Sequence, residues 1–144
     1  MNVLIIGSGG REHALAWKIA QSKLLDKLFI APGNAGTLQH GYNVDLDANN
    51  FEQIGQFALD NDVSIIVVGP EAPLVAGIHD FFLEKSELKN IAIIGPVKKA
   101  AMLEGSKDFA KSFMKRHNIP TGQYHTFSKD EVKEAISYLE NLEA

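Results

Sequence analysis

The sequence predicts an α/β protein built on a doubly wound parallel sheet with helices on both of its faces. Three short runs, residues 3–7, 64–69 and 91–95, are rich in β-branched residues, lack polar alternation and each end on glycine. Such runs are typical of parallel strands that are buried on both faces. Segments with helical spacing of apolar residues separate them, so strand and helix alternate through residue 96 and right-handed crossovers are expected. This pattern predicts a Rossmann-like domain.

The helices of this domain are predicted from apolar side chains that fill one helical face. The first helix follows the strand that ends at Gly7, the second precedes residue 64, and Pro73 can open the third. Residues 27–34 and 42–46 are weaker strand candidates, each after a helix or a glycine-rich turn. The apolar positions of the three helices are, in order, Leu15, Ala16, Ile19 and Ala20; Phe51, Ile54 and Ala58; and Leu74, Ile78, Phe81 and Phe82.

The pattern changes after Pro96. Residues 97–117 are helical in character, and residues 119–127 are expected to form a turn and one strand. Ser128 with Glu131 predicts a capping box that opens a last helix. One strand and one such helix cannot close a core of their own. This segment therefore either docks on the first domain or begins a second domain.

The composition excludes several classes of protein. The chain of 144 residues has a formal charge of -4 and its 14 basic residues are spread along it, so no nucleic-acid surface is predicted. There is no cysteine, which excludes disulfides and thiol nucleophiles. No apolar stretch approaches the roughly 20 residues that span a bilayer, and no basic leader precedes the first strand. We therefore expect a cytoplasmic protein with no membrane partner.

Neither a histidine metal site nor a serine hydrolase is indicated. Ser8 lies in the opening glycine turn but lacks the G-x-S-x-G elbow of a hydrolase. The histidines show no metal-ligand spacing; they are His13, His40, His79, His117 and His125. We expect no metal ligand in this chain.

The opening stretch "VLIIGSGGREH", residues 3–13, allows two kinds of binding site. Gly7 and Gly9 fit a dinucleotide fingerprint, but Glu12 stands where the third glycine is needed, and no acidic residue ends the second strand. These departures disfavour NAD. What remains is a strand-to-helix turn in which the amides of Gly9 and Gly10 can converge on a phosphate at a helix N-terminus.

The charged residues that follow the turn suit the same kind of ligand. Arg11 can add a bidentate contact to a phosphate, and Glu12 and His13 can hold hydroxyls or an amine. A plainer interpretation stays open, in which the glycines only make a tight turn and Glu12 is an ordinary acid of the first helical turn.

Two further loops are expected at the same edge of the sheet. The loop at residues 31–37 contains Gly33 and Asn34, which can expose backbone amides, and Glu71 follows Pro70 just past another strand. Ligands of open α/β sheets bind outside the carboxyl ends of the strands. Either loop alone is more simply explained as a rigid turn. Together, the three loops outline a pocket with a glycine-lined phosphate end and an acidic end.

Four stretches together resemble the phosphoribosylamine-glycine ligase family, also called glycinamide ribonucleotide synthetase, of the ATP-grasp superfamily. They are "GSGGREHAL" at 7–15, "PGNAGT" at 32–37, "VVGPEAPLVAGI" at 67–78 and "AAMLEGSKDFAKSFMKRHNIPT" at 100–121, in the family's order and spacing. The resemblance covers the chain as the N-terminal part of that family. It implies a parent ligase that joins glycine to 5-phosphoribosylamine with ATP, through glycyl phosphate, in the second step of purine biosynthesis.

The resemblance also implies a division of the chain and a set of ligand-binding residues. Residues 1–100 would form a pre-ATP-grasp substrate domain, and residues 101–144 a linker helix with the first elements of an ATP-grasp domain. Lys107 would reach a nucleotide phosphate. The implied substrate-binding residues are Gly9, Gly10, Arg11, Glu12, His13, Gly33, Asn34, Pro70 and Glu71.

By the same resemblance, the cofactors would be ATP and Mg2+ or Mn2+. Most of their site would lie in the remainder of the ATP-grasp domain, so we expect no catalytic residue and no activity in these 144 residues alone. The sequence departs from the family at Val97 and Gly122, where serine and alanine are usual. Two other functions stay open: an NAD-binding module of an oxidoreductase, and a non-catalytic module that binds a sugar phosphate.

Overall fold

The computed structural model describes residues 1–142, and the chain divides into two compact units, Met1–Gly105 and Ser106–Ala144. The sheet and most of the helices belong to the first unit, and two helices belong to the described part of the second. Among residues 1–142 no helix combines the length and the apolar character needed to cross a bilayer.

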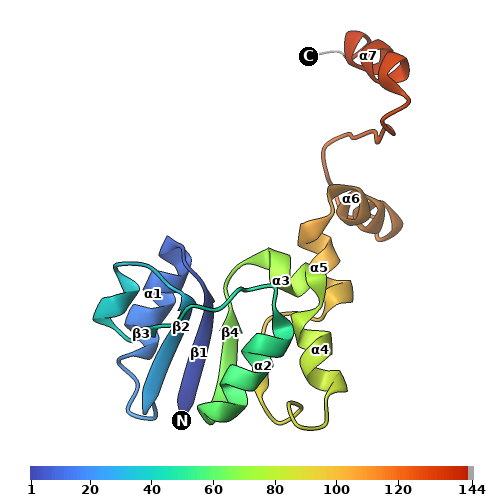
Figure 1. The fold of residues 1–144 in the computed structure, drawn as a ribbon. Coiled ribbons are helices and arrows are strands. Elements are labelled where there is room, and N and C mark those ends of the chain that lie inside the picture. Colours follow the sequence, from blue (N-terminus) through green and yellow to red (C-terminus); the bar gives the residue numbers. More distant parts are fainter. Residues whose placement is uncertain (143–144) are drawn as a thin grey trace. The chain divides into compact units, whose positions relative to one another are not determined.

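A parallel sheet of five strands forms the centre of the first unit (Figure 1). Its strands are β1 (Asn2–Gly7), β2 (Lys27–Pro32), β3 (Tyr42–Asn43), β4 (Val63–Val68) and β5 (Ala92–Ile94). Their spatial order is β3-β2-β1-β4-β5, so the order reverses between β1 and β4. This order confirms the predicted doubly wound α/β fold, and ligands of such folds bind where the strand order reverses.

The three central strands end at the same level. Gly7 at the end of β1 pairs with Pro32 at the end of β2, and Ile6 pairs with Val68 at the end of β4. The amide of Gly69 continues this ladder, because it donates to the carbonyl oxygen of Ile6 at 3.0 Å. The loops that follow the three strands therefore begin side by side.

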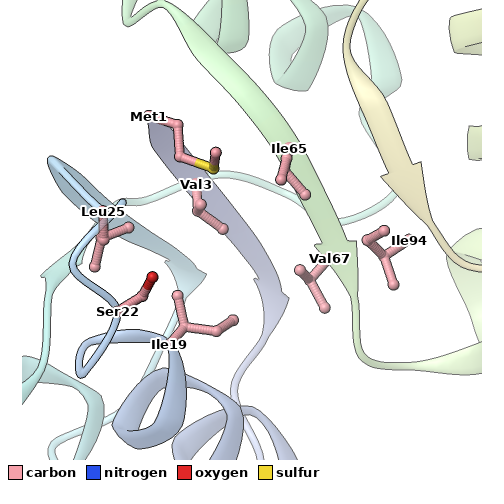
Figure 2. A pocket seen from close by; sticks show the side chains of 8 residues that line it. All are labelled: Met1, Val3, Ile19, Ser22, Leu25, Ile65, Val67 and Ile94. Carbon is pink, nitrogen blue, oxygen red and sulfur yellow. The ribbon is translucent and has the colours of Figure 1, made fainter.

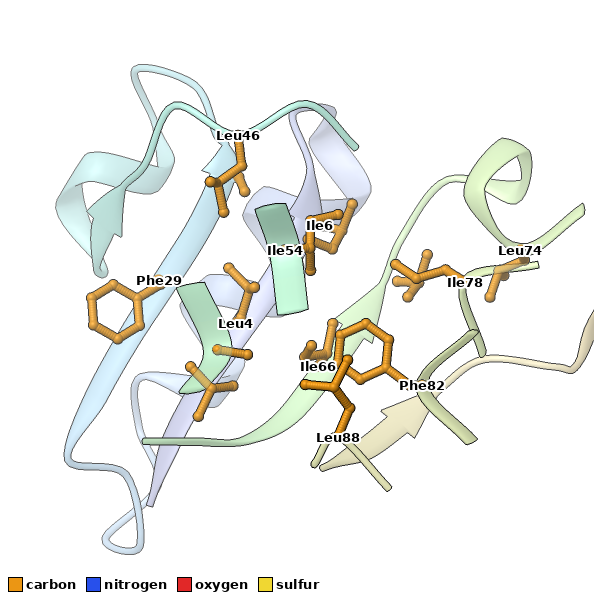
Figure 3. Close-up of a cluster of buried hydrophobic side chains, with 14 of the residues drawn as sticks. Leu4, Ile6, Phe29, Leu46, Ile54, Ile66, Leu74, Ile78, Phe82 and Leu88 are labelled. Carbon is orange, nitrogen blue, oxygen red and sulfur yellow. The ribbon is translucent and has the colours of Figure 1, made fainter. Parts of the chain in front are cut away.

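Helices pack on both faces of the sheet. Successive residues of a strand point to opposite faces, so Val3 and Ile5 of β1 pack with Ala16 of α1, whereas Leu4 and Ile6 join a second cluster with α2. Figure 3 shows that second, larger cluster, which reaches across the sheet to Phe82 and Leu88. The helices of this unit are α1 (Gly10–Ile19), η1 (Thr37–Gln39), α2 (Phe51–Asp60), α3 (Glu71–Ala76), α4 (Ile78–Glu84) and α5 (Lys98–Gly105).

An apolar hollow of about 280 Å³ lies on the α1 side of the sheet, beside β4 (Figure 2). Ile65 and Val67 of β4 are only half-buried there, and Ile94 of β5 is 55% exposed. The lining residues are Met1, Val3, Ile19, Ser22, Leu25, Ile65, Val67 and Ile94. None of the candidate ligand-binding residues is among them, so the hollow is not the predicted pocket.

The helix predicted to open at Pro73 is two helices, α3 and α4, and it begins earlier than expected. Gly77 ends α3 in the left-handed conformation, with φ 107°, and its amide bonds to the carbonyl oxygens of Pro73 and Leu74. Such a terminus is typical of glycine. Pro73 is the third residue of α3, where a helix has no partner for an N–H in any case, so the helix can start at Glu71.

Residues 97–117, predicted to be helical in character, form two helices with a break between them. α5 ends at Gly105, and α6 (Lys107–Arg116) begins after Ser106, whose side chain accepts a hydrogen bond from the amide of Phe109 at 3.2 Å. Serine in this position favours a new helix start because its oxygen satisfies an unpaired amide of the first turn.

The strand predicted within residues 119–127 is absent, since this segment has neither helix nor strand. A strand needs a neighbour for its backbone hydrogen bonds, and the described part of the second unit contains none. The last helix, α7 (Val132–Glu140), starts later than the capping box predicts. Half of that box is present: the amide of Ser128 donates to Oε2 of Glu131 at 2.6 Å, and this bond lowers the pKa of the Glu131 carboxyl.

Candidate functional site

The turn between β1 and α1 is organised around the carboxylate of Glu12. This side chain is 5% exposed and folds back so that its Oε2 accepts a hydrogen bond from the amide of Gly9 at 2.6 Å. A glutamate at the third helical position that bonds the residue before the helix is half of a capping box. The carboxylate of Glu12 therefore caps the turn between β1 and α1.

The first amides of α1 have no acceptor among residues 1–142. The amide of His13 is the first that closes a helical bond, to the carbonyl oxygen of Gly9 at 3.1 Å. The preceding N–H groups, those of Gly10, Arg11 and Glu12, are the free donors that every helix start carries. They lie at the positive end of the helix dipole, where an anion is favoured.

Arg11 links the first loop to the loop after β4. Its Nη1 donates to the carbonyl oxygen of Gly69 at 2.5 Å, so the exposed side chain crosses from the start of α1 to the end of the neighbouring strand. Its other guanidinium nitrogens have no partner among the described residues and can still contact a ligand. Arg11 could therefore contact a phosphate through these nitrogens while its Nη1 keeps the bond to Gly69 that bridges the two loops.

Asn34 joins the loop after β2 to the same turn. Its Nδ2 donates to the carbonyl oxygens of Ser8, at 2.8 Å, and Gly9, at 3.3 Å. The amide of Gly33 adds a backbone bond to the carbonyl oxygen of Gly7 at 3.1 Å. The loop after β2 is therefore bonded to the glycine turn through both a side chain and the main chain.

Two residues that the motifs did not single out hold this second loop. Thr37 is fully buried, and Asn43 on β3 is half-buried; both bond to Asn34. Gly33 has φ 73° and lies so close to the Asn43 amide group that any side chain at Gly33 would collide with it. Thr37 is the last residue of the "PGNAGT" stretch, which was the available signal, whereas nothing in the sequence pointed to Asn43.

The remaining predicted residues take different positions. Pro70 precedes α3 and Glu71 is its first residue, exposed and without a hydrogen bond to any residue in 1–142. His13 faces the second loop, because its Nε2 lies 3.3 Å from Nε2 of His40 and the two rings are stacked with centroids 5.3 Å apart. The structure thus brings the loops after β1, β2 and β4 together through Arg11 and Asn34, whereas Glu71 follows the third loop as the first residue of α3.

Comparison with known proteins decides the family. Residues 1–104 match the family described as "Phosphoribosylglycinamide synthetase, N domain". The chain belongs to this family. The chain is 54% identical, over 141 residues, to the phosphoribosylamine-glycine ligase of Haemophilus influenzae, a match that covers 96% of this chain and 32% of that one. The chain therefore spans about a third of the length of the relatives it matches.

Solved structures agree with the fold of this chain. The phosphoribosylamine-glycine ligase of Thermotoga maritima superposes with a TM-score of 0.64 at 34% identity, covering 96% of this chain and 30% of that one. The N5-carboxyaminoimidazole ribonucleotide synthetase of Thermus thermophilus superposes with a TM-score of 0.63 at 19% identity, covering 94% and 36%. The second likeness concerns the fold alone.

Beyond the residues that match the synthetase N domain, Lys107 is the first residue of α6 and is exposed. It belongs to the second unit, whereas the three loops belong to the first. No group of three or more histidine, aspartate or glutamate side chains gathers in a metal-binding arrangement within residues 1–142.

Proposed function

We propose that this chain is the N-terminal portion of a phosphoribosylamine-glycine ligase, and that its three joined loops hold 5-phosphoribosylamine. The observation that carries the proposal is the bonding of the loops after β1, β2 and β4 to one another through Arg11 and Asn34, in a chain of this family. Loops at this reversal of strand order are where open α/β sheets bind their ligands.

In this proposal the phosphate of the substrate is held at the start of α1. The amides of Gly10 and Arg11 are unpaired and donate to it, and the guanidinium of Arg11 adds a charge-assisted contact. Glu12 is buried and already accepts the hydrogen bond of the Gly9 amide, so its role in this proposal is to shape the turn. Glu71 and His13 are then available for the ribose hydroxyls or the amine.

The same proposal assigns the chemistry of the parent ligase. A carboxylate is a poor acyl donor, so the carboxylate of glycine takes the γ-phosphoryl group of ATP, and the amine of phosphoribosylamine displaces phosphate from the resulting glycyl phosphate. The products are glycinamide ribonucleotide, ADP and phosphate, as in the second step of purine biosynthesis. The protein contributes positioning and charge stabilisation.

We propose residues 1–100 as the substrate domain and residues 101–144 as a linker helix with the first elements of an ATP-grasp domain. Lys107 would reach a phosphate of ATP, and the Mg2+ or Mn2+ ligands would come from the remainder of that domain. The chain alone is therefore expected to bind the sugar phosphate without catalysing the ligation.

The test is an NMR titration of the amides in the glycine turn. Ribose 5-phosphate, which carries the sugar and phosphate without the reactive amine, is added to the chain labelled with 15N, and NAD is added to a second sample. We expect ribose 5-phosphate to shift the amides of Gly9, Gly10 and Arg11 and NAD to leave them unchanged. Shifts caused by NAD alone would show a dinucleotide module, and shifts caused by neither ligand would remove the site.

A further inference from the structure

A closed ring of hydrogen bonds lies behind the loop after β2. The amide of Asn34 donates to Oγ1 of Thr37 at 2.8 Å, and Oγ1 of Thr37 lies 2.6 Å from Oδ1 of Asn43. Nδ2 of Asn43 returns to the carbonyl oxygen of Asn34 at 2.8 Å. Oγ1 of Thr37 also lies 2.8 Å from the carbonyl oxygen of Asn34. Its single hydroxyl proton is best placed toward Oδ1 of Asn43, which is closer and has no other donor among residues 1–142. Each of the three residues then both donates and accepts.

The ring holds the main chain of Asn34 while its side chain faces the glycine turn. Oδ1 of Asn34 accepts from the amides of Gly36, at 2.7 Å, and Thr37, at 3.1 Å, which leaves Nδ2 directed at the carbonyl oxygens of Ser8 and Gly9. With every polar atom of Asn34 engaged, the side chain has one orientation. The bonds therefore run without a break from β3 to the turn that precedes α1.

We infer that Thr37 and Asn43 are positioning residues for the sugar-phosphate site, acting through Asn34; this inference rests on the proposed function. Neither residue bonds directly to the glycine turn; each is connected to it only through Asn34. Neither therefore needs to touch the ligand. Their role is to fix the Ser8 and Gly9 carbonyls, and with them the direction in which the following amides point. A preorganised set of donors binds more tightly because less conformational freedom is lost on binding.

The burial of Thr37 makes this ring sensitive to the loss of one hydroxyl. Thr37 is 0% exposed, so a valine of nearly the same shape would leave the amide of Asn34 and Oδ1 of Asn43, both on half-buried residues, without this partner. Buried polar groups that lose a partner tend to rearrange until they find another. The rearrangement available here is a rotation of Asn34, which would release the glycine turn.

The experiment compares Thr37→Val with Thr37→Ser and with Asn43→Ala. Dissociation constants for ribose 5-phosphate are measured by NMR titration at a temperature well below the thermal unfolding midpoint of each variant. Each variant is then fully folded, so a change in stability alone does not alter the measured affinity. We expect T37V and N43A to bind about fivefold to tenfold more weakly than the wild type, the factor of about one hydrogen bond. T37S keeps the hydroxyl and should bind within about twofold of the wild type.

The control is Asn61→Ala. Like Asn43, Asn61 is half-buried and its Nδ2 donates to a carbonyl oxygen, that of Phe57, at 2.9 Å. It follows α2 and its own carbonyl oxygen bonds Asn2, the first residue of β1, so it lies at the amino end of the sheet. N61A should lower stability without changing the affinity for ribose 5-phosphate.

Spectra without ligand separate this inference from the proposed function. T37V should shift the amides of Ser8, Gly9 and Gly10, while T37S should leave them near their wild-type positions. If T37V leaves these amides and the affinity unchanged, the positioning role is overturned and the proposed site stands. If the wild type itself does not bind ribose 5-phosphate, the proposed function fails and the positioning role fails with it.

Discussion

At the residue scale, the first turn of α1 separates two opposite charges by burial. Glu12 is buried and its carboxylate is satisfied by the amide of Gly9, whereas Arg11 is exposed and reaches the carbonyl of Gly69. An anion at the free amides of this turn therefore meets an accessible guanidinium, while the carboxylate is turned toward the turn itself. We therefore expect Arg11, and not Glu12, to contact the phosphate of the proposed ligand.

The first prediction concerns Arg11. Arg11→Ala should weaken binding of ribose 5-phosphate by about tenfold to a hundredfold, because a hydrogen bond to a charged group contributes about 1.5 to 3 kcal/mol. The matched control is Lys18→Ala, which removes a cation from the last turn of the same helix. Calorimetric titration of both variants measures the effect. Equal affinities of R11A and the wild type would remove Arg11 from the site.

The second prediction concerns the acid dependence of stability. The N-terminal ammonium bonds the Asp26 carboxylate, and this bond, with the attraction of the two charges, lowers the pKa of Asp26. A lowered folded pKa contributes stability at a pH above the usual value of about 4, and that contribution is lost as pH falls through the folded pKa. Asp26→Asn should therefore make the unfolding midpoint fall less between about pH 4 and pH 2.

Urea unfolding across this pH range measures the Asp26 effect, and acetylation of the N-terminus should reproduce it. A direct NMR titration of the Asp26 carboxyl gives the pKa itself. If Asp26 titrates at or above the usual aspartate value, the ion pair with Met1 does not form in solution.

The site residues fall into two groups: those that a short sequence motif identifies, and those that depend on tertiary contacts. Gly9, Gly10, Arg11 and Asn34 could be proposed from the sequence because each lies within a short run that already has a meaning, a glycine turn next to a strand. The ring formed by Thr37 and Asn43 could not, because it depends on β3 lying next to β2, a tertiary pairing. The burial of Glu12 was likewise not predicted, since an acid in a first helical turn is as often exposed.

At the element scale, the apolar strands of the sheet were predicted more reliably than the helix ends, whereas the weaker strand candidate at 42–46 is shortened to Tyr42–Asn43. The apolar runs of β1 and β4 have no competing period, so their bounds agree with the structure to within a residue or so. A helical pattern, in contrast, continues across a break when the apolar spacing is kept on both sides. Gly77 and Ser106 interrupt two such patterns because each residue satisfies a helix end locally.

The third prediction tests the break at Gly77. Its φ of 107° is costly for a residue with a side chain, and a Cβ there would meet only Lys98 at 3.4 Å, so Gly77→Ala measures backbone conformation rather than a steric clash. We expect a loss of about 1 kcal/mol or more in the free energy of unfolding. Urea unfolding gives the value, with Gly10→Ala as control, because Gly10 is helical and has open space around its Cβ position. A G77A protein as stable as the wild type would contradict the left-handed terminus of α3.

At the scale of the whole molecule, the alternation of strand and helix predicted the order of layers, and the resemblance of four stretches predicted the family. The second unit was predicted less well, because a strand expected within residues 119–127 needs a neighbour that the described residues do not supply. Core packing shows the same division. Both hydrophobic clusters lie within the first unit, and no residue of α6 or α7 is buried.

The fourth prediction follows from this division. The three loops, the ring behind Asn34 and both hydrophobic clusters all lie within Met1–Gly105. A chain that ends at residue 105 should therefore keep the unfolding midpoint of the sheet and the affinity for ribose 5-phosphate, within about twofold. NMR spectra of the short and the full chain should overlay for residues of β1, β2 and β4. If the short chain loses its dispersed spectrum, the first unit does not fold without the residues beyond Gly105. If it keeps that spectrum but loses its affinity, those residues complete the sugar-phosphate site, and the site cannot be assigned to the first unit alone.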